Sequence, residues 1–201
     1  MSIFKKRTKF EEFWEWFSEH EEFIRNNLEQ NTDEVASLVT EKIKTIHPNI
    51  YFEIPFLVTN DKRDFIISAD GDYDVFDEVI DLCDIAPTYT HWNIIPFRPR
   101  TYQEDQTIDM DGITLSYEDI YFQYDLTDLP IDVNVYIRGY DGKDNRFIHA
   151  YFILLDTLIG EFDAVTVIGE TSVHTLTEED IPNLIPIKKI RDLVDELSVA
   201  N

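Results

Sequence analysis

Apolar residues recur at helical spacing over residues 10–28 and again over residues 35–46, and each series forms one apolar stripe. Thr8, followed three residues later by Glu11, has the pattern of a capping box, in which the two side chains satisfy backbone N–H groups at the start of a helix. Pro48 ends the second series, because the residue before a proline disfavours helix. The sequence therefore predicts an antiparallel pair of helices at the N-terminus.

After this helical pair, the apolar residues follow patterns typical of strands. Turn pairs such as Asp-Gly and Leu-Pro separate several of these segments, and a meander of antiparallel strands is the simplest arrangement for them. Pro55 lies inside the first segment, which indicates an edge strand or a bulge. The expected strands are residues 50–58, 64–69, 91–97, 107–115, 120–124, 132–140 and 163–168.

Three further helices are predicted from apolar spacing and from the residues that bound them. The first follows residue 72 and places Cys83 on its apolar side. The second runs from Asn145 to a stop at Gly160, where a glycine can adopt the left-handed conformation that ends helices. The last begins at Pro186, since proline is favoured in a first helical turn. Together these patterns predict an α+β fold, a largely antiparallel sheet or meander packed with about five helices.

The length and composition indicate a single globular domain over residues 1–201. Aromatic residues make up 13% of the chain, which is far more than a disordered chain would carry. Cys83 is the only cysteine, so no internal disulfide can form, as expected in a reducing cytoplasm. The chain has no apolar stretch of signal-peptide length near its N-terminus and no run of about 18 apolar residues. We therefore expect a cytoplasmic protein that does not span a membrane.

Charge is the strongest signal in the composition. The chain has 41 Asp and Glu residues against 17 Lys and Arg, a net charge of −24. Such a field repels nucleic acids and anionic membranes, because binding to them depends on cationic groups. A basic protein is attracted instead, and charge complementarity speeds such an association. The leading hypothesis is therefore an acidic protein-binding or inhibitor module, comparable to the immunity proteins that neutralise basic toxins.

The segment between Arg100 and Arg138 has nine acidic residues and no Lys or Arg. This local excess of charge makes it the candidate surface for the basic partner. The candidate partner-binding residues are Glu104, Asp105, Asp109, Asp111, Glu118 and Asp119.

An alternative hypothesis is a divalent-metal-dependent hydrolase that uses a cluster of aspartates. Its candidate ligands, Asp70, Asp72, Asp74 and Asp77, follow the second predicted strand, and the first three resemble the opening of a calcium loop. Such a loop needs glycine at its sixth position, where this chain has Val75. A structural interpretation is that one of these aspartates caps the next helix and the others are solvated.

Two arginines, Arg98 and Arg100, flank Pro99 and could clamp a carboxylate or phosphate, or instead pair with acidic residues of this chain. The five histidines lack the spacing of zinc ligands, and neither a nucleophile elbow nor a glycine-rich phosphate loop is found. The sequence thus assigns no catalytic residue, predicts no cofactor and favours a non-enzymatic role. A third hypothesis is a structural protein that forms oligomers through Phe13, Trp14 and Phe17, and the choice between monomer and homodimer stays open.

Several short motifs resemble a pattern found in uncharacterised bacterial proteins that contain a domain of unknown function. The motifs are Ile67-Ser68-Ala69-Asp70-Gly71, Ala86-Pro87, His91-Trp92, Pro96-Phe97-Arg98-Pro99-Arg100 and Gly160-Glu161. This resemblance implies a bacterial cytosolic protein and transfers no activity or catalytic residue. These positions are accordingly interpreted as strand ends, a helix stop and a turn.

Overall fold

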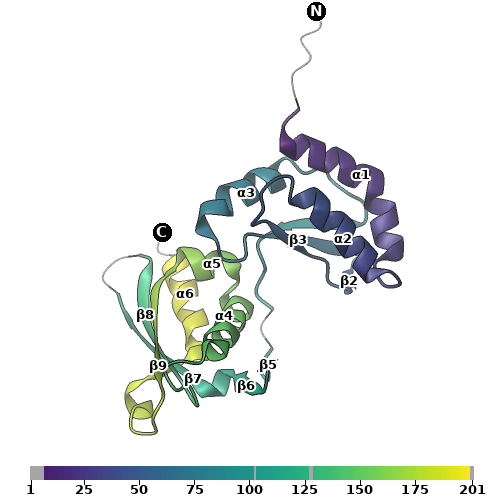
Figure 1. Ribbon diagram of the computed structural model, residues 1–201. Coiled ribbons are helices and arrows are strands. Elements are labelled where there is room, and N and C mark those ends of the chain that lie inside the picture. The colour runs from purple at the N-terminus through teal and green to yellow at the C-terminus, as the bar shows by residue number, and fades with distance from the viewer. Residues whose placement is uncertain (1–6, 102, 127–128, 200–201) are drawn as a thin grey trace, which may run out of the picture. The chain divides into compact units, whose positions relative to one another are not determined.

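The computed structural model describes residues 7–101, 103–126 and 129–199. Contacts within the chain group into two compact units, which we call unit 1 (Met1–Phe97) and unit 2 (Arg98–Asn201). Each unit has its own sheet and helices (Figure 1). The sequence predicts one domain over residues 1–201, and whether the two units unfold together as one domain stays a prediction.

Unit 1 begins with the predicted pair of helices. Thr8 accepts a hydrogen bond from the backbone N–H of Glu11 (3.2 Å), and the Glu11 carboxylate accepts one from the backbone N–H of Thr8 (2.7 Å), so the capping box is confirmed. The elements of this unit are α1 (Lys9–Asn27), α2 (Thr32–Ile43), β1 (Tyr51–Glu53), β2 (Val58–Thr59), β3 (Lys62–Ser68), the 3₁₀ helix η1 (Tyr73–Val75), α3 (Phe76–Asp84) and β4 (Trp92–Pro96).

The sheet of unit 1 is built around β3. Strands β1 and β2 both pair with it in antiparallel orientation, while β4 pairs with it in parallel. The chain reaches β4 through η1 and α3, which gives a strand–helix–strand crossover where the sequence suggested only antiparallel neighbours. The predicted strand 50–58 is divided into β1 and β2, with Pro55 in the gap between them.

Aromatic side chains fill the core of unit 1. Phe13 and Phe17 of α1 are completely buried, and the Phe17 ring lies 4.9 Å from that of Phe65 on β3. Residues 65–68 are all buried, so both faces of β3 are covered, because successive side chains of a strand point to opposite faces. On α3, Phe76 and Val79 are buried as expected and Leu82 is completely buried as well, while Cys83 is only half-buried.

Unit 2 combines a hairpin, a second sheet and three helices. Its elements are β5 (Thr107–Met110), β6 (Ile113–Ser116), the 3₁₀ helix η2 (Tyr117–Asp119), β7 (Ile120–Asp125), β8 (Ile131–Ile137), α4 (Asn145–Ile159), α5 (Glu161–Thr166), β9 (Ile168–Thr175), the 3₁₀ helix η3 (Ile181–Asn183), β10 (Ile185–Pro186), the 3₁₀ helix η4 (Ile187–Lys189) and α6 (Ile190–Val199). Helix α4 ends at Gly160 as expected, with a φ of +84° there.

The sheet of unit 2 has the strand order β10-β7-β8-β9. The first two pairs are antiparallel, whereas β9 lies parallel to β8 after the chain has passed through α4 and α5. The prediction of a strand over residues 163–168 is wrong, because residues 161–166 form α5 and the strand begins at Ile168. The antiparallel-dominated α+β class, with a helical pair first and a helix last, is confirmed.

Buried and exposed residues alternate strictly along the first half of β8, so one face of this sheet forms the core of unit 2. Val133 and Val135 of β8 share a buried cluster with Leu154 and Leu158 of α4 and with Val194 of α6. The helices α4 and α6 thus cover this face of the sheet (Figure 1). In the described part of the chain, no helix is both long and apolar enough to cross a membrane.

Candidate functional site

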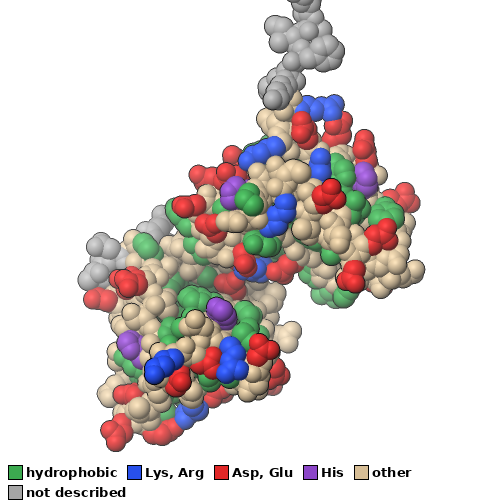
Figure 2. All heavy atoms as spheres, viewed as in Figure 1, with side chains coloured by type: hydrophobic (Ala, Val, Ile, Leu, Met, Phe, Trp, Pro, Cys, Tyr) green, Lys and Arg blue, Asp and Glu red, His purple; other side chains and the backbone are tan. Residues whose placement is uncertain are grey.

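Acidic side chains exceed basic ones in each unit. Residues 1–97 contain 20 Asp and Glu against 9 Lys and Arg, and residues 98–201 contain 21 against 8. Asp and Glu side chains are spread over the visible face of both units, with fewer basic side chains among them (Figure 2). The charge imbalance is therefore general, and further features are needed to single out a site.

Two of the predicted partner-binding residues, Glu118 and Asp119, lie on η2 and interact with basic residues of their own unit. The Glu118 carboxylate accepts a hydrogen bond from Lys188 at 2.5 Å. Asp119 accepts hydrogen bonds from the backbone N–H and the hydroxyl of Ser116, and Arg138 lies 3.6 Å away. These two carboxylates consequently serve the structure of unit 2.

The other four predicted residues lie on the β5–β6 hairpin or in the turn before it, and all four are exposed. Asp109 points to the outer face of β5 and accepts a hydrogen bond from a threonine hydroxyl across the hairpin at 2.5 Å. Asp111 lies in the hairpin turn, where its carbonyl accepts a hydrogen bond from Arg146. Glu104 and Asp105 form no ion pair with any residue that the structure describes. The predicted surface thus has two parts. The four residues of the hairpin and the turn before it are exposed, whereas the two residues of η2 pair with basic residues of unit 2.

The aspartates proposed as metal ligands are not gathered into a ligand set. Asp72 caps η1 by accepting a hydrogen bond from the backbone N–H of Asp74 (3.2 Å), and its other oxygen accepts one from Asn49 (3.0 Å). Asp70 lies in the turn after β3 with a φ of +52°, and Asp77 is exposed on α3. Among the described residues, no three His, Cys, Asp or Glu side chains are placed to hold a metal ion. The geometry corresponds to the structural interpretation of a cap and solvated carboxylates.

The two arginines proposed as an anion clamp bind carboxylates of unit 2. The Arg98 guanidinium pairs with Asp156 at 2.9 Å, and its backbone N–H donates to the fully buried Glu161 at 3.0 Å. Arg100 pairs with Asp163 at 2.7 Å. These contacts fasten the segment after residue 97 to α4 and α5, so the structure assigns both arginines to internal pairing instead of anion binding.

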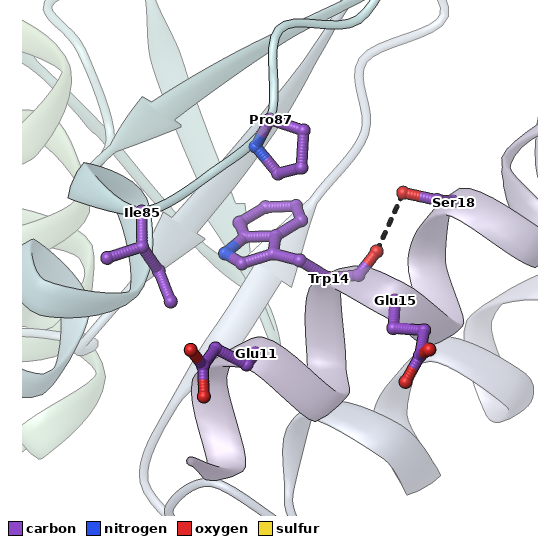
Figure 3. Close-up of a pocket in the computed structure, with 6 residues that line it drawn as sticks. All are labelled: Glu11, Trp14, Glu15, Ser18, Ile85 and Pro87. Carbon is purple, nitrogen blue, oxygen red and sulfur yellow. Dashed lines mark hydrogen bonds between the residues drawn. The ribbon is translucent and has the colours of Figure 1, made fainter. Parts of the chain in front are cut away.

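A hollow in unit 1 combines apolar walls with acidic side chains, and sequence analysis did not identify it. Its volume is about 350 Å³. Helix α1 forms one side and the segment after α3 forms the other (Figure 3). The lining residues are Glu11, Trp14, Glu15, Ser18, Ile85 and Pro87. The four residues from α1 have the i, i+3, i+4, i+7 spacing of one helix face, which could have been found from sequence, whereas the opposite wall depends on the tertiary fold.

The floor of this hollow is held by two hydrogen bonds of Trp14. The Trp14 indole, only 3% exposed, donates to the backbone carbonyl of Leu82 at 2.7 Å and so joins α1 to α3. The Ser18 hydroxyl donates to the Trp14 carbonyl at 2.8 Å (Figure 3). A side chain that enters the hollow would therefore meet a fixed surface.

The rim of the hollow is negative. Glu11 and Glu15 are exposed carboxylates one helical turn apart, and Glu15 pairs with the guanidinium of Arg7. Ile85 caps the C-terminal end of α3, where a helix carries partial negative charge. The hollow therefore favours a cation that also presents an apolar stem.

Comparison of the chain with models of protein families, with curated proteins and with solved structures gave no match. The function is therefore inferred from the α+β fold, the charge of the chain and the geometry of its surface.

Proposed function

We propose that the chain is an acidic binding module that recognises a basic protein and acts on it as an inhibitor, in the manner of immunity proteins. The observation that supports this most is the excess of acidic residues in both units, since each has more than twice as many acidic as basic side chains. Electrostatic complementarity of this kind raises association rates and excludes acidic or neutral partners. The same field disfavours nucleic acids and anionic membranes as partners.

No specific observation favours the two other hypotheses. The aspartates suggested for a metal-dependent hydrolase are separated into a cap and exposed side chains. The apolar stripe suggested for oligomerisation is occupied within unit 1, where Phe13 and Phe17 are completely buried and Trp14 is 3% exposed. A cytoplasmic location belongs to the same proposal, because a half-buried, reduced Cys83 is compatible with it.

The proposal is tested by immobilising the full chain, passing the lysate of the source cell over it at low salt, and eluting with a salt gradient. An unrelated protein of similar net charge serves as the control column, because any acidic surface retains basic proteins. A basic protein that only this chain retains is then purified, and its Kd is measured at several salt concentrations. We expect the Kd to rise with salt, since exposed charges are screened over about 10 Å at 0.1 M. A Kd that does not respond to salt would contradict the electrostatic basis of the proposal.

A further inference from the structure

We infer that the hollow between α1 and the segment after α3 receives an arginine side chain of the basic partner. This inference rests on the proposed function and names the contact through which it would operate. It differs from the sequence-based prediction, which placed the partner on residues 104–119 of unit 2.

The shape of the hollow suits a single long side chain. Its volume of about 350 Å³ is near the lower end of the range for ligand pockets, which is about 300–1,000 Å³. Ile85 is 46% exposed although it is a large apolar residue, and Pro87 beside it is exposed as well. An arginine buries its three methylene groups along such apolar surface while its charged end stays near water. The two residues therefore form a wall for the stem of an incoming side chain.

The charges of the hollow complement the end of that side chain. Glu11 and Glu15 are spaced four residues apart on α1, so their carboxylates lie on the same helix face (Figure 3). The C-terminal end of α3 adds partial negative charge at the opposite wall. A cation between these elements would be attracted from both sides.

The contact between Arg7 and Glu15 supports arginine in particular, because the chain itself places a guanidinium on this rim. A guanidinium is planar, presents five donors and lies flat on apolar side chains, whereas a lysine ammonium is a compact and more strongly hydrated charge. Arg7 is 60% exposed and Glu15 47% exposed, so the pair can open at little cost when another arginine arrives.

The experiment uses the full chain labelled with ¹⁵N and titrated with acetyl-arginine amide as the probe. The indole N–H of Trp14 lies in the floor of the hollow, and that of Trp92, which donates to Glu21 at 2.8 Å, serves as an internal reference. We expect a saturable shift of the Trp14 indole resonance with no comparable shift for Trp92. Acetyl-lysine amide should bind more weakly, and acetyl-citrulline amide, which has the same shape without charge, should not bind.

Charge-removing variants assign the contact to the rim. Glu15→Gln and Glu11→Gln should each raise the Kd of the probe about two- to five-fold, the effect of losing one exposed ion pair. The Glu11→Gln variant keeps the cap of α1, since glutamine also completes a capping box. Glu12→Gln is the matched control, because Glu12 is an exposed acid on the same helix turn outside the hollow. Arg7→Gln should lower the Kd about two-fold by releasing Glu15.

With the probe, either of two results would overturn the inference: a Trp14 resonance that does not shift saturably, or a Glu12→Gln effect as large as that of Glu15→Gln. The basic protein recovered from the lysate distinguishes failure of this inference from failure of the proposed function. If it binds the Glu11→Gln/Glu15→Gln double variant as tightly as the wild type, the hollow is not its site and the proposed function stands. If the lysate yields no basic protein that this chain alone retains, and the probe does not bind the wild-type chain, both proposals fail.

Discussion

Gly169, at the start of β9, has no room for a side chain, and we expect Gly169→Ala to destabilise unit 2. A Cβ at this position would lie 2.6 Å from the Oδ1 of Asp132, and 3.2 and 3.3 Å from the carbonyl oxygens of Pro130 and Ile131. Carbon–oxygen contacts ordinarily lie at about 3.3–3.6 Å, so the Asp132 carboxylate must move. That movement breaks its hydrogen bond with the backbone N–H of Glu170, which is 2.8 Å long.

The expected change in the free energy of unfolding has three contributions. Loss of the hydrogen bond costs about 0.5–1.5 kcal/mol. The two tight backbone contacts add about 1 kcal/mol, the low end of the cost of overpacking. Replacing glycine restricts the unfolded chain, which stabilises the folded state by about 0.4–1 kcal/mol and offsets part of this loss. We therefore expect a net loss of about 0.5–2 kcal/mol in the free energy of unfolding.

The assay is urea unfolding followed by far-UV circular dichroism, with tryptophan fluorescence recorded in parallel because all three tryptophans lie in unit 1. Asp132→Ala should cost about 1 kcal/mol by itself, since it removes the same hydrogen bond. The double variant with Gly169→Ala should then lose about 1 kcal/mol less than the sum of the two single losses. Strict additivity, or a Gly169→Ala variant as stable as the wild type, would refute this account of the contact with Asp132.

The following further outcomes are expected. A fragment of residues 98–201 should unfold cooperatively by circular dichroism, because unit 2 has its own buried core, and a fragment without a transition would favour the single-domain prediction. Burial, with a smaller contribution from Asp84, raises the pKa of Cys83 from 9.0 to about 12, so at pH 8 the thiolate fraction should be about a thousandfold lower in the folded than in the unfolded chain, and alkylation correspondingly slow. Because the folded state holds this proton more tightly, the corresponding stability should be present below pH 9 and lost as the pH rises towards 12. Trp14→Phe should lower the free energy of unfolding by about 1–3 kcal/mol, since it leaves the buried carbonyl of Leu82 without its donor. Added Mg²⁺, Mn²⁺ or Ca²⁺ should leave the Tm unchanged, and a rise with any one ion would revive the metal-dependent hydrolase.

The elements that sequence analysis predicted best are those fixed by local interactions. Helix α1 runs over Lys9–Asn27 where residues 10–28 were expected, because its apolar period and its capping box are both contained in the segment itself. Gly160 marked the end of α4 for the same reason. Such signals need no knowledge of the rest of the fold.

The errors arose where distant contacts decide the structure. Residues 163–168 contain several β-branched residues and were expected to form a strand, yet they begin within α5, whose first residue Glu161 is completely buried beside Arg98. An acid buried in this way cannot be identified from its own neighbours in sequence, because its partner lies 63 residues away. The parallel pairing of β9 with β8 likewise depends on the helices between them.

The contrast between local signals and distant contacts also applies to the candidate site, and it changes where on the molecule a partner should be sought. A count of charges along the sequence selected the segment between Arg100 and Arg138, but Glu118 and Asp119 interact there with basic residues that come later in the chain. Glu15 is likewise paired with Arg7, so pairing with a basic residue does not by itself distinguish the two places. The hollow on α1 has fewer acidic residues but adds apolar walls that hold the stem of a side chain. Interfaces gain most of their affinity from such anchored side chains and only a little from exposed charges, so the search for the partner's contact should begin at this hollow, with its apolar wall of Ile85 and Pro87.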